Sequence, residues 1–140
     1  FEGRHAIVSE VMERVEVVGK EREQVVLDSV EEPDKRTRDR SKRSGRAVRD
    51  HAYREVLDLL AILYRDTAIV RAGAEELVAN VDRVADLRAA VDRYPDADWA
   101  GAALSLEEAR AGLTYNVSSE AMLEVALSRT RRSILGHSRG

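Results

Sequence analysis

The residues best suited to metal binding in this sequence are three histidines, His5, His51 and His137, which lie far apart along the chain. Glu2 and His5 have the Glu-x-x-His spacing with which helical bundles hold a di-iron centre. That centre needs a second such motif, and neither of the other histidines has a Glu three residues before it. We therefore interpret Glu2 and His5 as surface residues near the start of the chain.

His51 and Glu55 lie one helical turn apart, which would place two zinc ligands on the same face of a helix. A zinc site needs three or four ligands, and no others are spaced nearby. Solvated surface residues are the better interpretation. We predict no metal and no cofactor for this chain.

Catalytic motifs are missing from the sequence. It has no nucleophile elbow, no Gly-rich loop with a phosphate-binding Lys and no dinucleotide-binding fingerprint. Adjacent acids, Glu75 with Glu76 and Glu107 with Glu108, would point about 100° apart on a helix and so do not converge. We predict no catalytic residues and hence no enzyme within these residues.

An Arg and an Asp follow an apolar helical run in "AILYRDTAIV", at Arg65 and Asp66. Neighbouring helix positions do not face each other, so each side chain is expected to reach a different partner. No His, Lys or metal ligand converges on Asp66. We predict that Tyr64, Arg65 and Asp66 act as a structural tether between helices or as a contact with another subunit.

A second charged feature is "EEPDKRTRDRSKRSGR", residues 31–46, which has no large apolar residue. Residues 35 to 49 include eight basic residues and one acid, Asp39. The basic residues are Lys35, Arg36, Arg38, Arg40, Lys42, Arg43, Arg46 and Arg49. Each basic residue that meets a phosphate releases a counterion, so the segment could bind nucleic acid without sequence preference. Three interpretations stay open: a solvated loop, a nucleic-acid contact or a protein contact. The candidate contact residues are Lys35, Arg36, Arg38, Arg40, Lys42 and Arg43.

The elements that must position these residues are helical. The chain has 140 residues, 44% hydrophobic and 35% charged, which is typical of one globular domain over 1–140. Apolar residues recur every three to four positions in several segments: 6–18, 20–30, 46–72, 74–79, 80–94, 96–115 and 118–132. We predict an all-α bundle of five or six helices, with a charged and poorly ordered insert at 31–45.

Several residues are expected to begin or end these helices. Gly19 and Gly73 are expected stops, and Asn80 or Asp82, Asp96 or Asp98, and Ser118 are expected to cap the helices that follow them. "NVS", residues 116–118, matches a glycosylation acceptor but is better interpreted as a loop and helix cap. The expected inward residues include Val15, Val18, Val25, Val26, Val30, Leu57, Leu63, Leu106, Leu123 and Val125.

Cellular context is only weakly indicated. There is no cysteine, which is compatible with a reducing cytoplasm. No run approaches the roughly 20 apolar residues of a membrane span, and the first residues do not resemble a signal peptide. Because the chain starts at Phe1 without a Met, we expect a piece of a longer protein.

Two stretches together resemble a known family. The first is "LLAILYRDTAIVRAGAEELVANVDRVADLRAAV", where an apolar helix ends in aromatic-Arg-Asp and an Asn-x-Asp follows Gly-Ala-Glu. The second is "SLEEARAGLTYNVSSEAMLEVAL", with Glu-Ala-Arg before a final Leu-rich helix. They are similar to the C-terminal domain of the delta-prime subunit of the bacterial DNA polymerase III clamp loader. Where that family has Asn-Pro before the last helix, this chain has Ser118 and Ser119.

The resemblance covers about residues 47–132 and implies a non-catalytic collar domain. In such clamp loaders the C-terminal domains of five subunits pack into a collar, so the implied partners are the gamma/tau and delta subunits in a bacterial cytoplasm, at the replisome. The related gamma/tau subunit has a comparable C-terminal domain, and these residues do not distinguish it from delta-prime with certainty. The alternative from the residues alone is a helical nucleic-acid-binding domain that uses the basic segment 35–49.

Overall fold

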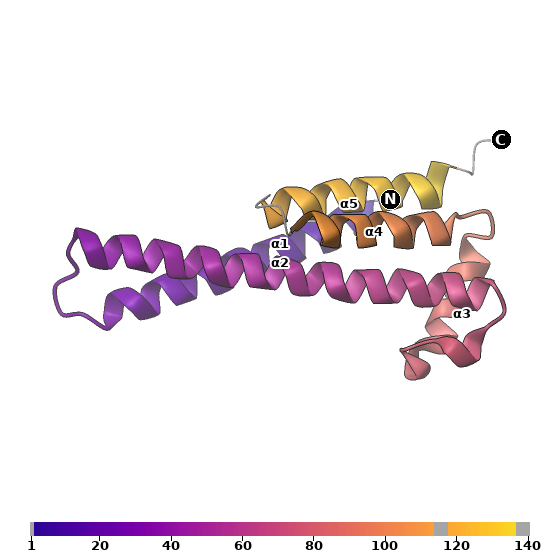
Figure 1. Cartoon of the computed structure of the whole chain (residues 1–140), viewed down its shortest axis with the longest axis horizontal. Helices are drawn as coiled ribbons and strands as arrows, with labels where there is room; N and C mark the ends of the chain where they lie inside the picture. Colours follow the sequence, from indigo (N-terminus) through magenta and orange to yellow (C-terminus); the bar gives the residue numbers. More distant parts are fainter. Residues whose placement is uncertain (1, 114–117, 137–140) are drawn as a thin grey trace. The chain divides into compact units, whose positions relative to one another are not determined.

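The computed structural model describes residues 2–113 and 118–136, with side chains described for Glu10 and from residue 12 onward. All regular structure in these ranges is helical. The elements, in order, are α1 (Glu2–Asp28), α2 (Lys35–Arg71), the 3-10 helices η1 (Glu75–Leu77) and η2 (Val81–Arg83), α3 (Val84–Arg93), α4 (Trp99–Gly112) and α5 (Ser119–Leu135) (Figure 1). The predicted all-α helical bundle is confirmed. None of the described helices is long and apolar enough to cross a membrane.

The chain forms two compact units, residues 1–53 and residues 54–140, and α2 contributes to both. The first unit is a helical hairpin in which α1 and the beginning of α2 run antiparallel (Figure 1). The turn between them leads into Asp34, whose carboxylate accepts a hydrogen bond from the Thr37 N–H (2.7 Å). This bond satisfies one of the free N–H groups at the start of α2.

Two predictions about this hairpin are wrong. Helix α1 does not stop at Gly19 but continues to Asp28, and α2 begins at Lys35 rather than at about Arg46. Most of the insert expected to be poorly ordered, 31–45, is therefore helical. The absence of large apolar residues was misleading, because two small residues, Ser41 and Gly45, form the buried side of α2 here. Arg and Lys also have high intrinsic helix propensity.

The second unit is built from the remainder of α2 together with α3, α4 and α5. Leu57, Leu106 and Leu123 are fully buried in it. Trp99 lies with Ala97, Ala102 and Ile134 in one apolar cluster, and Val70, Val78 and Leu87 form another. These clusters hold α3, α4 and α5 against α2, which contributes Tyr64 and Ala68 to the first cluster and Ile69 and Val70 to the second.

Five residues expected to face inward are exposed instead: Val18, Val25, Val30, Leu63 and Val125. The buried face of these helices is therefore narrower than the apolar periodicity predicts. The caps of the last two helices agree better with expectation. Asp98 accepts a hydrogen bond from the Gly101 N–H (2.8 Å), and Ser118 accepts one from the Ala121 N–H (3.3 Å).

The region between α2 and α3 departs from the prediction. Gly73, at φ 79°, ends α2 as expected, since few residues other than Gly adopt that backbone conformation. However, neither Asn80 nor Asp82 caps α3, which starts at Val84 without a side-chain cap. The Asn80 side chain is committed to Asp66 instead. Residues 114–117, which include the expected end of the α4 segment at Tyr115 and most of "NVS", lie outside the described ranges.

Candidate functional site

Asp66 is the centre of the most developed polar site in the second unit. Its side chain is fully buried, at 0% exposure. Its carboxylate accepts hydrogen bonds from the backbone N–H of Ala79 (3.1 Å) and of Asn80 (2.8 Å) and from the Asn80 side-chain amide (2.8 Å). The aspartate therefore ties helix α2 to the short segment between η1 and η2. We call this arrangement the Asp66 tether.

The three hydrogen bonds decide the charge state of Asp66. Burial disfavours the ionised carboxylate, but the N–H groups of Asn80 and Ala79 and the Asn80 amide outweigh that effect. Arg65 adds a smaller favourable interaction. The pKa of Asp66 consequently lies below its usual value, and the group is an anion at neutral pH. Because all three donors hold the ionised form, the arrangement suits structure rather than proton transfer.

The two residues before Asp66 lie in different environments. Tyr64 is half-buried against the apolar cluster, with its ring centroid 6.0 Å from that of Trp99. Arg65 is exposed. Adjacent positions thus point in different directions along α2, one towards the core and the other towards solvent. A subunit contact through Arg65 remains a prediction.

Arg110 makes a second polar connection, which was not predicted from the sequence. Its guanidinium contacts Asp58 of α2 (2.7 Å) and Glu107 of its own helix α4 (2.9 Å). Nearby, Arg54 of α2 donates a hydrogen bond to the Leu113 carbonyl (3.1 Å). These side chains line a shallow surface depression. Its charged groups are paired with one another, so it has no constellation of converging reactive groups.

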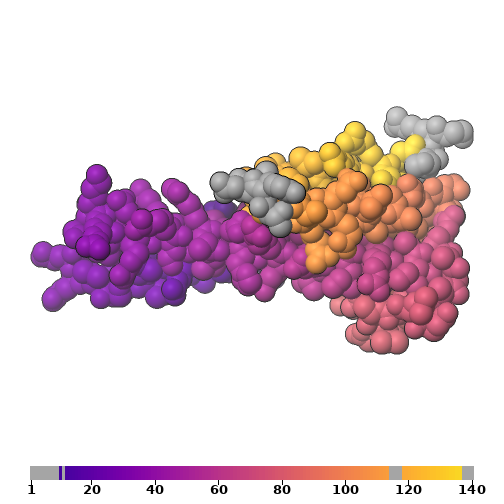
Figure 2. Space-filling model, in the orientation of Figure 1, coloured from indigo at the N-terminus to yellow at the C-terminus, as the bar shows by residue number. Residues whose placement is uncertain are grey.

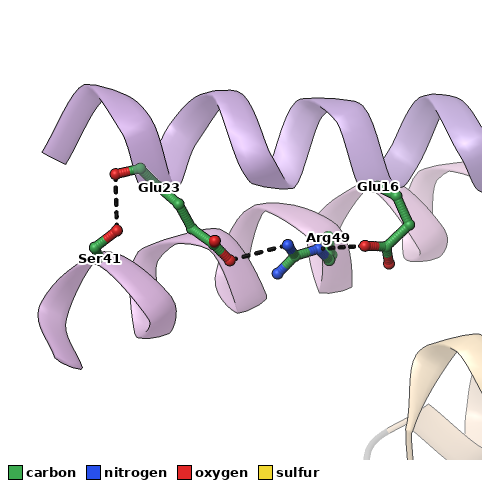
Figure 3. A network of polar contacts seen from close by, with 4 residues as sticks. All are labelled: Glu16, Glu23, Ser41 and Arg49. Carbon is green, nitrogen blue, oxygen red and sulfur yellow. Dashed lines mark hydrogen bonds and ion pairs between the residues drawn. The ribbon is translucent and has the colours of Figure 1, made fainter. Parts of the chain in front are cut away.

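A third polar cluster lies in the first unit, around Arg49 (Figure 3). The Arg49 guanidinium contacts Glu16 (3.1 Å) and Glu23 (2.9 Å), both from α1. Burial lowers the pKa of Arg49, but the two carboxylates outweigh this effect and raise it above its usual value. The Ser41 hydroxyl also donates to the Glu23 carbonyl oxygen (2.7 Å). Arg49, predicted among the basic residues, is thus a structural residue of the hairpin.

Two glycines make room for this cluster. A Cβ at Gly19 would lie 2.4 Å from Arg49 Nε, and a Cβ at Gly45 would lie 2.4 Å from Glu23 Cγ. Each partner side chain therefore passes over a glycine of the opposite helix. Gly19 was expected to stop a helix, but here it permits a close approach. A glycine within each of two helical segments was the sequence signal for this close approach.

The six basic candidates on α2 are all exposed: Lys35, Arg36, Arg38, Arg40, Lys42 and Arg43. Among their described contacts, Arg38 donates to the Pro33 carbonyl (3.0 Å), and none of the six has an ion pair. In Figure 2 long side chains project from this purple part of the surface. The structure therefore brings them together on one helix, where Asp34 is the described electrostatic partner of Arg38.

The metal-binding candidates do not assemble. Among the described residues no three His, Cys, Asp or Glu side chains lie close enough to hold an ion. His51 is exposed, while the side chain of His5 and the whole of His137 lie outside the described part.

The adjacent acids also diverge. Glu75 forms an ion pair with Arg88, whereas Glu108 of α4 contacts Arg129 of α5 (3.5 Å). Glu107 belongs to the Arg110 cluster.

Comparison with protein families, with curated proteins and with solved structures finds no match to this chain.

Proposed function

We propose that this chain is a non-catalytic oligomerisation domain, the collar domain of a clamp-loader delta-prime subunit, which helps to assemble the complex that places the sliding clamp on DNA. The observation that carries the proposal is the Asp66 tether. The resemblance depends on aromatic-Arg-Asp followed by Asn-x-Asp, and the Asp of the first motif accepts two hydrogen bonds from the Asn of the second and one from the preceding Ala79 N–H. The two halves of the motif form one structural element.

The second stretch of the resemblance supports the same proposal. In Glu-Ala-Arg, residues 108–110, Ala109 is buried and Arg110 binds Asp58 on α2. Arg110 therefore links α4 to the long helix, as Asp66 links the segment before α3 to it. Residues that fix helix positions are what an assembly module needs.

Exposed apolar side chains around the tether indicate a surface for a neighbouring subunit. Leu59 and Leu63 precede Asp66 by seven and three residues, which puts them on the same face of α2. Leu77 and Val81 flank the tethered segment, and they are 63% and 76% exposed. Large exposed apolar side chains are a feature that protein interfaces use.

The proposal is tested by reconstitution. The chain is mixed with the purified gamma/tau and delta subunits of the same organism and analysed by size-exclusion chromatography, with intact delta-prime as the positive control. We expect co-elution that Leu63→Lys with Val81→Lys abolishes. The matched control is Val18→Lys with Val25→Lys, which places the same charges on exposed valines of α1. Absence of a complex with the unmodified chain, where intact delta-prime assembles, would refute the proposal.

A further inference from the structure

The first half of α2 has a charge pattern that the fold itself does not use. Seven basic side chains are exposed between residues 35 and 46, and only Asp39 opposes them on this stretch: Lys35, Arg36, Arg38, Arg40, Lys42, Arg43 and Arg46. None of the seven has an ion pair within the described chain. Arg49, one turn further on, is the basic residue that the hairpin neutralises.

This pattern is unfavourable for the helix that carries it. Lys35, Arg36 and Arg38 lie in the first turn, where the helix dipole favours acids; that turn has no acid of its own, and the cap residue Asp34 just before it supplies the nearest negative charge. Arg36 with Arg40, and Arg38 with Lys42, are like charges four residues apart, which destabilise a helix. Asp39, three or four residues from Lys35, Arg36, Lys42 and Arg43, offsets part of this repulsion, but seven cations against one acid leave a surplus of positive charge that a partner of opposite charge would neutralise.

The chemistry of this face identifies the class of partner. The sequence from 35 to 46, "KRTRDRSKRSGR", has no apolar side chain larger than the Thr methyl group. A helix that inserts between lipids needs apolar residues, and the buried centre of a protein interface is largely apolar. Bases of single strands stack on aromatic rings, which are also absent. Phosphate groups need only cations.

We propose that the exposed basic face of α2, residues 35–46, binds the phosphate backbone of duplex nucleic acid without reading its sequence. The face extends over about 17 Å of helix, along which a DNA duplex presents about ten phosphate charges. Asp39 lies within this face and repels the phosphates. The inference does not depend on the proposed collar function.

The test measures affinity of the full chain for a fluorescent 20-base-pair duplex by anisotropy, at several salt concentrations. Three to four phosphate contacts give a slope of about −3 in log K against log salt, which weakens binding about 60-fold between 50 and 200 mM. Two duplexes of different sequence should bind equally. Binding that does not respond to salt, or no measurable binding at 50 mM salt, would refute the proposal.

Variants locate the contact. Two triple variants divide the face, Arg36→Gln/Arg40→Gln/Arg43→Gln and Lys35→Gln/Arg38→Gln/Lys42→Gln, and Gln preserves helix propensity. At least one triple should weaken binding tenfold or more, and the slope should flatten by about 0.9 for each phosphate that is no longer neutralised. The charge-matched control replaces exposed arginines of the second unit: Arg83→Gln/Arg129→Gln/Arg132→Gln. If neither triple differs from this control, the proposal is wrong.

Asp39→Asn tests the proposal in the opposite direction, because it should strengthen binding: it removes a negative charge and leaves all the basic side chains unchanged. Loss of its repulsion should tighten binding about twofold to fivefold. Weaker binding by this variant would contradict the proposed face. Vesicles that contain phosphatidylserine should bind far more weakly than the duplex; equal or tighter binding to vesicles would assign the face to membranes instead.

Discussion

Replacement of Asp66 by Asn should destabilise the second unit strongly although the two side chains have nearly the same shape. The carboxylate accepts three hydrogen bonds, two at Oδ2 and one at Oδ1. An amide can accept on one side only, so at least one N–H loses its acceptor and meets an NH₂ group. The remaining bonds lose their charge assistance, which roughly halves their strength. Together these losses amount to about 2–4 kcal/mol in the free energy of unfolding.

The loss is measured by urea unfolding. Trp99 is the sole tryptophan and is buried in the second unit, so its fluorescence reports the unfolding of that unit. With an m value of about 1.5 kcal/mol/M, a loss of 3 kcal/mol lowers the urea midpoint by about 2 M. The matched control is Asp82→Asn, an exposed aspartate two residues beyond Asn80, which should move the midpoint little.

The pH dependence separates the carboxylate's charge from its shape. The pKa of Asp66 is lowered in the folded protein, so the unfolded chain binds more protons than the folded one between the two pKa values. The stabilisation by this group is thus complete above the unfolded pKa of about 3.9 and is lost as pH falls through the folded pKa. The stability difference between wild type and Asp66→Asn should stay constant from pH 7 to pH 5 and shrink below about pH 4. A difference under 0.5 kcal/mol at pH 7, or one that grows with acid, would refute the reasoning.

Three smaller perturbations test other contacts. Gly45→Ala should destabilise the hairpin by about 1 kcal/mol, because the new Cβ would meet Glu23 at 2.4 Å and overpacking exceeds the gain in helix propensity; thermal unfolding followed by far-UV circular dichroism measures it, and a stabilised variant would contradict the close approach. Gly73→Ala should cost about 1 kcal/mol in urea unfolding because φ is positive there, and a neutral result would argue against that conformation. Ser118→Ala should cost about 1 kcal/mol through loss of the α5 cap; faster amide exchange at Ala121 would accompany it, and unchanged exchange would count against the cap.

The helical class was predictable because periodic apolar residues dominate most of this sequence, whereas the boundaries depended on features that periodicity does not contain. Helix α2 starts eleven residues before the expected Arg46, because its buried side there consists of two small residues, Ser41 and Gly45, and not of large apolar ones. In the candidate site, the sequence predicted that Asp66 contacts another residue, but it did not identify that residue. Asn80 or Asp82 was predicted to cap α3, because Asn before a helix caps as readily as it donates an amide hydrogen bond. Asn80 is recognised as the partner only from the folded chain, in which residues 66 and 80 are in contact.

The Asp66 tether also explains why a costly group occupies the side of α2 that faces the η1–η2 segment. Replacing a buried ionic group by apolar residues is often neutral or stabilising, so stability alone does not require an aspartate there. An apolar side chain would hold the segment less specifically, because apolar contacts lack the direction of three hydrogen bonds. The bonds to the Ala79 and Asn80 N–H groups fix the backbone between Leu77 and Val81, and therefore the positions of both exposed apolar side chains. The tether contributes precision to a surface, which is the property that the proposed assembly role demands.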